Sequence, residues 1–333
     1  MVTIDDVARA AGVSRSTVSY ALSGKRPITR ETRDRITVAI EKLGFTVNAG
    51  ARALASSETM VLGLLLQFHQ DEFPPAMLQY ILAVTTASRA LGYDILLVTE
   101  ADGADAVKRI TSSNMVDGVV LLDVTHDDPR LAPLREARQP GAMVGLPRDT
   151  DGVDVFDLDF EGSARILVDH LHELGHEEII LVTPPKHVFE RGGAYAWRFR
   201  DAALERAASH GVAMHFHYGE SQQPRITKAL NAALDAHPSA TGLIVHNDAS
   251  IAVLPQVLHE RGVRVPQDLS VVSLYARDFG QSFLLPYTAV ETSPDGLGRL
   301  AVQQLVRRIN DPDSVSTVVE FVEPVLTIRG STA

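Results

Sequence analysis

Several features are missing from this 333-residue chain, and each absence narrows what the protein can be. Cysteine is absent, which excludes disulfide bonds and thiolate chemistry and is compatible with a reducing compartment. No apolar run reaches the roughly 18 residues of a membrane-spanning helix. The N-terminus enters a polar segment without the pattern of a signal peptide, so we expect a cytoplasmic protein with no membrane partner.

The sequence signatures of several enzyme classes are also missing. There is no P-loop, no dinucleotide-binding glycine pattern after a strand and no nucleophile elbow. A match to the zinc-protease pattern H-E-x-x-H at 172–176 is rejected, because Gly175 should end the helix before the second histidine. The acids of 149–161 lack the spacing of a calcium-binding loop, and we predict a polar loop and an edge strand there. We therefore expect no enzyme, no metal and no cofactor.

Charge is unevenly distributed along the chain. The formal net charge is −11, yet residues 1–57 contain nine Lys or Arg and five Asp or Glu, which gives +4 there and −15 in the remainder. A positive segment attracts phosphates, while an acidic remainder repels DNA. The pattern indicates nucleic-acid binding confined to the beginning of the chain.

The beginning of the chain has the spacing of a helix-turn-helix. Thr3 and Asp6 form a capping-box start, and apolar side chains then recur at helical period. Gly12 can take the left-handed conformation that ends this helix, and Ser14 can cap the next one. A third helix is predicted over 30–43. Two short helices joined by a tight glycine turn are the shape that presents the second helix to the DNA major groove.

Beyond a short polar joint at 56–59, apolar runs alternate with amphipathic segments. The runs predicted to be buried strands are 61–66, 94–98, 118–122, 142–146, 179–182, 212–216, 242–245 and 270–274. The segments predicted to be helices include 77–91, 162–174, 197–210, 226–236, 251–261 and 296–309. This alternation is typical of parallel sheets with helices on both faces. Its length predicts two doubly wound α/β lobes after the small all-α head, with a ligand site between the lobes, at the carboxyl ends of the strands.

The head resembles the DNA-binding domain of the LacI/GalR family of transcriptional repressors. The matching segments are the opening at 3–8, Ala-Gly-Val-Ser at 11–14, Thr-Val-Ser at 17–19, Thr-Arg at 32–33, Leu-Gly-Phe at 43–45 and 48–55, which is similar to the family's hinge. The body is similar to the family's periplasmic-binding-protein-like effector domain at 116–118, 170–176, 247–248, 262–272 and 323–331. The resemblance implies a helix-turn-helix head over 1–46, a hinge helix and linker over 47–59, and a two-lobe effector-binding and dimerisation domain over 60–333.

The resemblance also implies which side chains of the head contact DNA. Arg15, Ser16 and Tyr20 are the expected specificity positions, and an arginine can donate two hydrogen bonds to O6 and N7 of guanine. The alternative for Arg15 is a solvated surface charge. The hydroxyl side chains expected to anchor the phosphate backbone are Thr3, Ser14, Thr17, Ser19, Ser23 and Thr29.

In the hinge, the expected DNA-contacting residues are Asn48, Ala51 and Leu54. The segment 48–55 has too few apolar groups to fold alone. The resemblance implies that two such helices pair on the operator, and that Leu54 enters the minor groove and kinks the duplex. Val47 stands where the family commonly has proline, although Asn48 can still cap the helix. Folding of the hinge is therefore expected to be coupled to operator binding.

Candidate effector residues follow the predicted strands. Sugar sites combine carboxylates and amides, which bind hydroxyl groups, with an aromatic face beneath the ring. Side chains of these kinds at the expected strand ends are Gln67, Asp71, Phe73, Asp123, Arg148, Tyr195, Tyr218, Asn247 and Tyr275. Asp71 and Arg148 could equally be solvated loop charges.

Two departures from the family weaken the expectation of a simple hexose. Many members carry an arginine in Arg-x-x-Gly-Phe, where this chain has Tyr-Ala-Trp-Arg-Phe at 195–199. Many also have Asp-Asp where this chain has Tyr-Ala at 275–276. Two tyrosine rings favour an oligosaccharide, a glycoside or a planar ligand such as a nucleoside. Arg198 and Asp278 are candidates to replace the lost charges.

The sequence thus predicts a homodimeric DNA-binding transcriptional regulator, a repressor of carbohydrate-utilisation genes controlled by a sugar or glycoside between its lobes. Dimerisation is expected from the body, because two heads must span the inverted repeat of a double-stranded operator. The chain stops at Ala333 without a heptad tail, so we expect no coiled-coil tetramer. The alternatives are an activator, or a sugar-binding or sugar-modifying protein with a vestigial head. Steep salt-dependent binding to an inverted repeat would exclude the vestigial head.

Overall fold

The computed structural model describes residues 2–23, 26–45, 58–69, 74–276, 286–313 and 316–333. Its contacts define one compact unit of residues 1–60 and 114–116 and a second of residues 61–113 and 117–333. No helix within these described ranges is long and apolar enough to cross a membrane.

The described part of the head contains the helices α1 (Ile4–Ala11), α2 (Arg15–Ser23) and α3 (Arg30–Leu43). The predicted capping box of Thr3 with Asp6 is present at the start of α1. Both Gly12 and Gly44 adopt left-handed backbone, with φ of +65° and +61°, and end α1 and α3. The small core that the three helices enclose contains Val7, Ala8, Ala11, Val18, Ile36 and Ala39. The head is therefore specified by local signals, as the sequence predicts.

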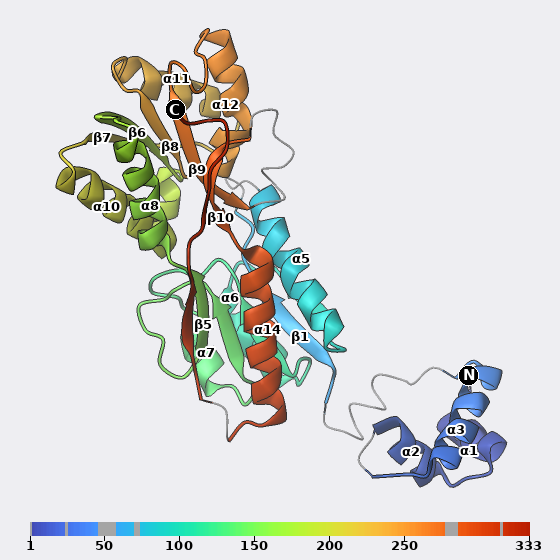
Figure 1. The fold of residues 1–333 in the computed structure, drawn as a ribbon. Coiled ribbons are helices and arrows are strands. Elements are labelled where there is room, and N and C mark those ends of the chain that lie inside the picture. Colours follow the sequence, from blue (N-terminus) through green and yellow to red (C-terminus); the bar gives the residue numbers. More distant parts are fainter. Residues whose placement is uncertain (1, 24–25, 46–57, 70–73, 277–285, 314–315) are drawn as a thin grey trace. The chain divides into compact units, whose positions relative to one another are not determined.

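The body has two α/β lobes (Figure 1). The first lobe comprises β1 (Val61–Leu65), α5 (Pro74–Ala90), β2 (Asp94–Val98), α6 (Gly103–Ser112), β3 (Gly118–Leu121), α7 (Leu131–Glu136), β4 (Gly141–Val144), β5 (Asp154–Leu158), α14 (Pro294–Asn310) and β11 (Val319–Val322). The second comprises α8 (Phe160–Glu173), β6 (Glu178–Thr183), α9 (Lys186–Glu190), α10 (Ala194–Ser209), β7 (Ala213–Tyr218), α11 (Arg225–Ala236), β8 (Gly242–Val245), α12 (Asp248–Glu260), β9 (Ser270–Ala276), β10 (Thr288–Thr292) and β12 (Leu326–Thr327). The six predicted helices and eight predicted strands correspond to elements of these two lobes.

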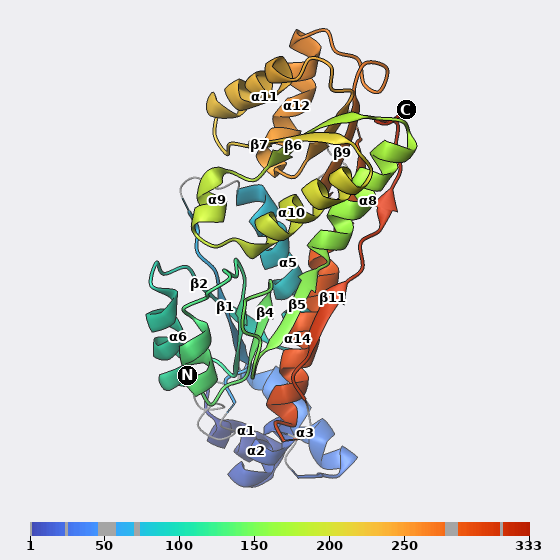
Figure 2. The same cartoon turned by 90° about the vertical axis from the view of Figure 1, so that its left-hand side faces the viewer.

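Each lobe contains a six-stranded sheet, and the two sheets have equivalent strand orders. The orders are β11-β5-β4-β3-β1-β2 and β12-β10-β9-β8-β6-β7. All pairings among the described strands are parallel except that of β12 with β10. The chain passes between the lobes after β5, after β10 and after β11, and the last passage is visible as the dark red segment of Figures 1 and 2. Three chain segments therefore connect the two lobes.

The interpretation of 149–161 as an edge strand is wrong. Strand β5 lies between β4 and β11, and all five of its residues are buried. Asp154 is fully buried because its carboxylate accepts hydrogen bonds from Gln304 Nε2 (3.2 Å) and Val318 N (3.0 Å) and lies 3.4 Å from Arg308 Nη1. These partners are far away in the sequence. The sequence alone therefore indicates an exposed strand wherever a strand carries acidic residues.

The rejection of the zinc-protease pattern is confirmed. Helix α8 ends at Glu173, and Gly175 has a φ of +89°. His176 lies beyond the helix, where its Nδ1 is 2.8 Å from the hydroxyl of Thr241. The two histidines of the pattern are therefore not on one helix.

Candidate functional site

The first turn of α2 presents an exposed arginine. Ser14 caps this helix, since its hydroxyl accepts a hydrogen bond from Thr17 N (3.1 Å). The side chain of Arg15 is 70% exposed and lies 3.7 Å from the carboxylate of Asp5, which is itself 57% exposed. An exposed ion pair of this kind is weak. The guanidinium of Arg15 is thus available to an external acceptor, as a recognition helix requires.

The other predicted DNA contacts of the head are also placed. Thr3 and Thr29 cap α1 and α3. The hydroxyls of Ser16 and Thr17 each lie 2.8 Å from that of Ser14, and the guanidinium of Arg26 lies 5.1 Å from the ring centre of Tyr20. Ser19 lies on α2 and is half-buried, Ser23 ends that helix, and the hinge residues Asn48, Ala51 and Leu54 lie outside the described residues. Three capped helix N-termini in one small unit give it several sites suited to phosphate groups.

In the body, a cavity of about 230 Å³ lies where both sheets present the carboxyl ends of their strands. Residues of both lobes line it. Those with chemical functions suited to ligand binding are Tyr80, Asp123, Asp157, Phe160, Arg191, Tyr195, Ser221, His246, Asn247, Asp248, Tyr275 and Thr292. Two doubly wound lobes thus create a ligand-sized space at the position the strand-end rule predicts.

Four of the predicted effector residues line this cavity, namely Asp123, Tyr195, Asn247 and Tyr275. Two of the four form hydrogen bonds within the second lobe. Asn247 caps α12, since its Oδ1 accepts a hydrogen bond from Ser250 N (2.7 Å). The buried Tyr275 donates its hydroxyl to Tyr287 O (2.9 Å). Asp123, by contrast, pairs with Arg191 across the two lobes, and Tyr195 packs against Phe160, so we retain both as candidates for direct contact with a ligand.

Three other predicted effector residues do not line the cavity. Gln67 donates to Ala101 O (2.6 Å). Arg148 is on the surface, 65% exposed, and pairs with Asp127. Tyr218 packs edge-on against Phe189, with ring centres 5.3 Å apart. Strand-end position alone could not show that these side chains have protein partners. Asp71 and Phe73 lie outside the described residues.

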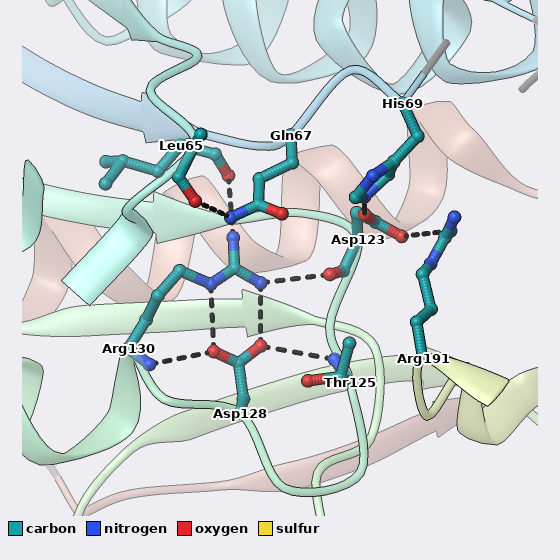
Figure 3. A network of polar contacts seen from close by, with 9 residues as sticks. Leu65, Gln67, His69, Asp123, Thr125, Asp128, Arg130 and Arg191 are labelled. Carbon is teal, nitrogen blue, oxygen red and sulfur yellow. Dashed lines mark hydrogen bonds and ion pairs between the residues drawn. The ribbon is translucent and has the colours of Figure 1, made fainter. Parts of the chain in front are cut away.

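Asp123 connects the two lobes (Figure 3). Its Oδ1 accepts a hydrogen bond from Arg191 Nη2 of the second lobe (3.0 Å), and its Oδ2 lies 3.3 Å from His69 Nε2. Beneath it, the buried guanidinium of Arg130 bonds both oxygens of Asp128 (2.9 and 2.7 Å) and donates to Asp123 O (3.0 Å). The Arg130–Asp128 pair fixes the loop after β3 and so positions Asp123. Sequence reasoning missed Arg191, because it follows a short helix and not a strand.

Arg198 does not replace the arginine of the family motif. It is not among the residues that line the cavity, and it donates from Nη1 to Asp157 (2.5 Å) and from Nε to Glu161 (2.8 Å). Asp157 is the penultimate residue of β5 in the first lobe, and Glu161 lies in the first turn of α8 in the second. Arg198 therefore holds together one of the chain passages between the lobes. The other compensating candidate, Asp278, lies outside the described residues.

Burial changes the protonation of two neighbouring residues of the cavity wall, His246 and Asp248. Burial lowers the pKa of His246 to about 3, so its imidazole is neutral near pH 7. Burial raises the pKa of Asp248 to about 7. Rings of Phe199 and Tyr195 surround His246, at 4.2 and 5.7 Å between ring centres. Both residues are next to the predicted Asn247. Their position at the end of β8 is the sequence signal that could have identified them as residues of the cavity wall.

Replacing Asp248 by asparagine is expected to change how stability depends on pH. The native pKa of about 7 exceeds the ordinary 3.8, so between these values the folded protein binds the proton more tightly than the unfolded chain. This contribution to the free energy of unfolding therefore falls as pH rises, by at most about 4 kcal/mol. Urea unfolding at about pH 5 and about pH 8 should show the Asp248→Asn variant gaining stability relative to wild type at the higher pH. Parallel pH profiles of the two proteins would contradict the burial of this carboxyl.

A basic helix-turn-helix head and a two-lobed body with a cavity between its lobes define a DNA-binding transcriptional regulator. Comparison with known proteins gives the family. Residues 3–48 match the lacI family of bacterial regulatory proteins, and residues 168–332 match a periplasmic binding protein-like domain. The chain belongs to the LacI family.

Relatives align along nearly the whole chain. The transcriptional regulator CelR of Thermobifida fusca is 27% identical over 337 residues, covering 99% of this chain and 98% of that protein. The ribose operon repressor of Escherichia coli (strain K12) is 26% identical, covering 99% and 100%. A structure of a CelR–cellobiose complex superposes with a TM-score of 0.70 at 25% identity, covering 99% of this chain and 100% of that one. The operator-bound lac repressor dimer, at 21% identity, shares the fold with a TM-score of 0.80 and 99% coverage of both chains.

Proposed function

We propose that the protein is a cytoplasmic, homodimeric repressor of carbohydrate-utilisation genes, with no catalytic activity of its own. A saccharide or glycoside in the cavity between the lobes sets its affinity for an inverted-repeat operator. The observation that carries this proposal is the cavity, which combines carboxylates of both lobes with aromatic rings. Carboxylates accept hydrogen bonds from sugar hydroxyls, and aromatic faces pack on the apolar faces of sugar rings.

Specific contacts support a role for the cavity in switching. The ion pair of Asp123 with Arg191 joins the first lobe to the second at the cavity wall. A ligand whose hydroxyls bind Asp123 or Arg191 competes with this pair and so favours a different orientation of the lobes. A ligand shifts a conformational equilibrium only by its difference in affinity for the two states. The Asp123–Arg191 pair forms in one orientation of the lobes, and the ligand replaces it in the other. This exchange supplies the difference in affinity.

The class of ligand is inferred from the cavity and from the relatives. Tyr195 is half-buried, lies against Phe160 with ring centres 5.5 Å apart and faces the cavity. Asp157 and Asp248 add two carboxyls. One relative was solved as a complex with cellobiose, and others are ribose operon repressors. A cavity with an aromatic wall and several carboxyls suits a neutral oligosaccharide or glycoside better than it suits an anionic ligand, because carboxylates repel anions.

A thermal-shift screen tests this assignment. Mono-, di- and oligosaccharides, sugar phosphates and nucleosides are added to the purified protein, and the unfolding midpoint is measured. A ligand at a hundredfold its Kd adds about 2.7 kcal/mol to the free energy of unfolding, a clear rise in midpoint. We expect one saccharide class to raise it and Tyr195→Ala to abolish the rise. Tyr218→Ala, a matched change outside the cavity lining, should retain it.

Two outcomes would contradict the assignment. A rise given by a nucleoside or a sugar phosphate, but by no neutral saccharide, would show a different effector class. A saccharide response that survives Tyr195→Ala but is lost with Tyr218→Ala would place the ligand elsewhere in the second lobe.

A further inference from the structure

Three histidines and a glutamate lie together on the second lobe, on elements that the effector cavity does not use. Glu178 is the first residue of β6, His215 and His217 lie on β7, and His237 directly follows α11. We call these four residues the histidine cluster. None of the four lines the cavity.

The fold explains why these residues meet. Strands β6 and β7 are parallel neighbours, with Ile180 opposite His215 and Val182 opposite His217. Alternate residues of a strand share a face, so Glu178 and both β7 histidines lie on the face that carries Ile180 and Val182. That face packs against α11, whose last residue precedes His237.

The donor atoms converge on a small volume. His215 Nε2 lies 3.3 Å from Glu178 Oε1, and His237 Nδ1 lies 4.0 Å from the same oxygen. One donor atom from each of the three residues lies within 4.8 Å of the other two. Bonds of about 2.0–2.1 Å in a tetrahedral site place ligand atoms about 3.4 Å apart. A shift of little more than an ångström therefore completes the ligand geometry.

The fourth residue fixes the orientation of His237. His237 Nε2 and His217 Nε2 lie 3.0 Å apart, so one ring donates a hydrogen bond to the other. When His237 donates from Nε2, its Nδ1 carries a lone pair on the side of Glu178. Histidines that bind metals commonly donate the opposite N–H to such an outer partner.

We propose that Glu178, His215 and His237 bind a divalent transition-metal cation such as Zn²⁺, Co²⁺ or Ni²⁺, with His217 as a positioning residue. Two imidazoles and one carboxylate suit these borderline cations, and an alkaline-earth cation would need more oxygen ligands. The ligand side chains are 21–36% exposed, so the cation can enter from solvent and keep a water ligand. The proposal replaces the expectation of no metal, which was drawn from motif spacing in the sequence. A bound cation would tie β7, an edge strand of its sheet, to the end of α11.

Metal binding to the full-length protein, freed of any polyhistidine tag, tests the proposal directly. Co²⁺ is titrated at micromolar protein, and its ligand-field absorption and binding isotherm are recorded. We expect one equivalent per chain for wild type. Loss of a partner outside the ligand set costs about 10- to 100-fold in affinity, which is the effect expected for His217→Gln. A larger loss is expected for His237→Gln, His215→Gln and Glu178→Gln.

A second histidine pair provides the matched control. His215 and His237 stack, with ring centres 3.8 Å apart, and His172 and His210 likewise stack, at 4.1 Å. Within the described chain only the histidine cluster brings three ligands together. His172→Gln should therefore leave Co²⁺ binding unchanged. Unfolding curves without metal establish that each variant is folded. If a histidine variant fails to fold, Glu178→Gln still tests the site, because glutamine has the same side-chain shape as glutamate. Absence of micromolar binding to wild type, or equal binding by wild type and folded His237→Gln, would overturn the proposal.

Discussion

Replacing Arg15 by alanine is expected to lower operator affinity by about 2–6 kcal/mol, because each bidentate arginine–guanine contact contributes about 1–3 kcal/mol and a dimer carries two. Arg15 lies in the first turn of α2, and its guanidinium lies 3.7 Å from the exposed carboxylate of Asp5. The loss should be confined to operators with the matching base pair. Fluorescence anisotropy on an operator selected from random sequences, and on its single-base variants, measures both effects.

Arg35 provides the control for charge. It is an exposed arginine of α3, so Arg35→Ala removes the same charge from the head without altering the proposed recognition helix. We expect Arg35→Ala to leave the preference between operator variants unchanged. If Arg15→Ala weakened binding to operator and scrambled DNA equally, the arginine would be a phosphate contact and the assignment of α2 as the base-reading helix would be wrong.

Replacing Arg198 by methionine is expected to lower the free energy of unfolding by about 3–5 kcal/mol, the usual cost of removing one partner of a buried ion pair. The side chains of Arg198 and Asp157 are 14% and 7% exposed. Even with Arg198 present, burial raises the pKa of Asp157 to about 6. Without the Arg198 guanidinium the pKa of Asp157 rises further, so the folded protein favours the protonated carboxyl of Asp157. The destabilisation should therefore be larger at about pH 8 than at about pH 5 in urea unfolding.

Arg264→Met is the matched control, since Arg264 bonds both oxygens of Asp268 (2.8 and 2.6 Å), as Arg198 does those of Glu161. The Arg264 side chain is 71% exposed, so its removal should have a much smaller effect. Restoring charge balance with Asp157→Asn should recover part of the stability lost in Arg198→Met. An equal effect of the two arginine variants would show that burial of the Arg198 pair is not what makes it important.

The parts of the fold that the sequence predicts well are those set by neighbouring residues. The cap of Thr3 on α1 and the left-handed Gly12 each depend on residues within one helical turn. The alternation of apolar and amphipathic runs likewise indicates two α/β lobes without knowledge of any long-range contact. Strand β5 was misplaced because the burial of Asp154 depends on Gln304, a partner 150 positions away.

The candidate site shows the same division. The rule that ligands bind at strand ends leads to Asp123 and Asn247, but it cannot identify Arg191, whose position depends on how the second lobe meets the first. Tyr80 was missed because it lies on α5, where an aromatic residue reads as helix core. Arg198 is a candidate replacement charge in the sequence because its partners Asp157 and Glu161 are about 40 residues away, and only the fold shows that it pairs with them.

The central claim is that a ligand in the body controls DNA binding by the head, and operator affinity with and without the saccharide from the thermal-shift screen tests it most directly. Anisotropy is measured on the selected inverted repeat at several salt concentrations. We expect the logarithm of affinity to fall steeply and linearly with the logarithm of salt concentration. We also expect the saccharide to change the operator Kd by about 5- to 150-fold, with Tyr195→Ala insensitive to it. Binding that is equal for operator and scrambled DNA, and that no cavity ligand alters, would contradict the claim.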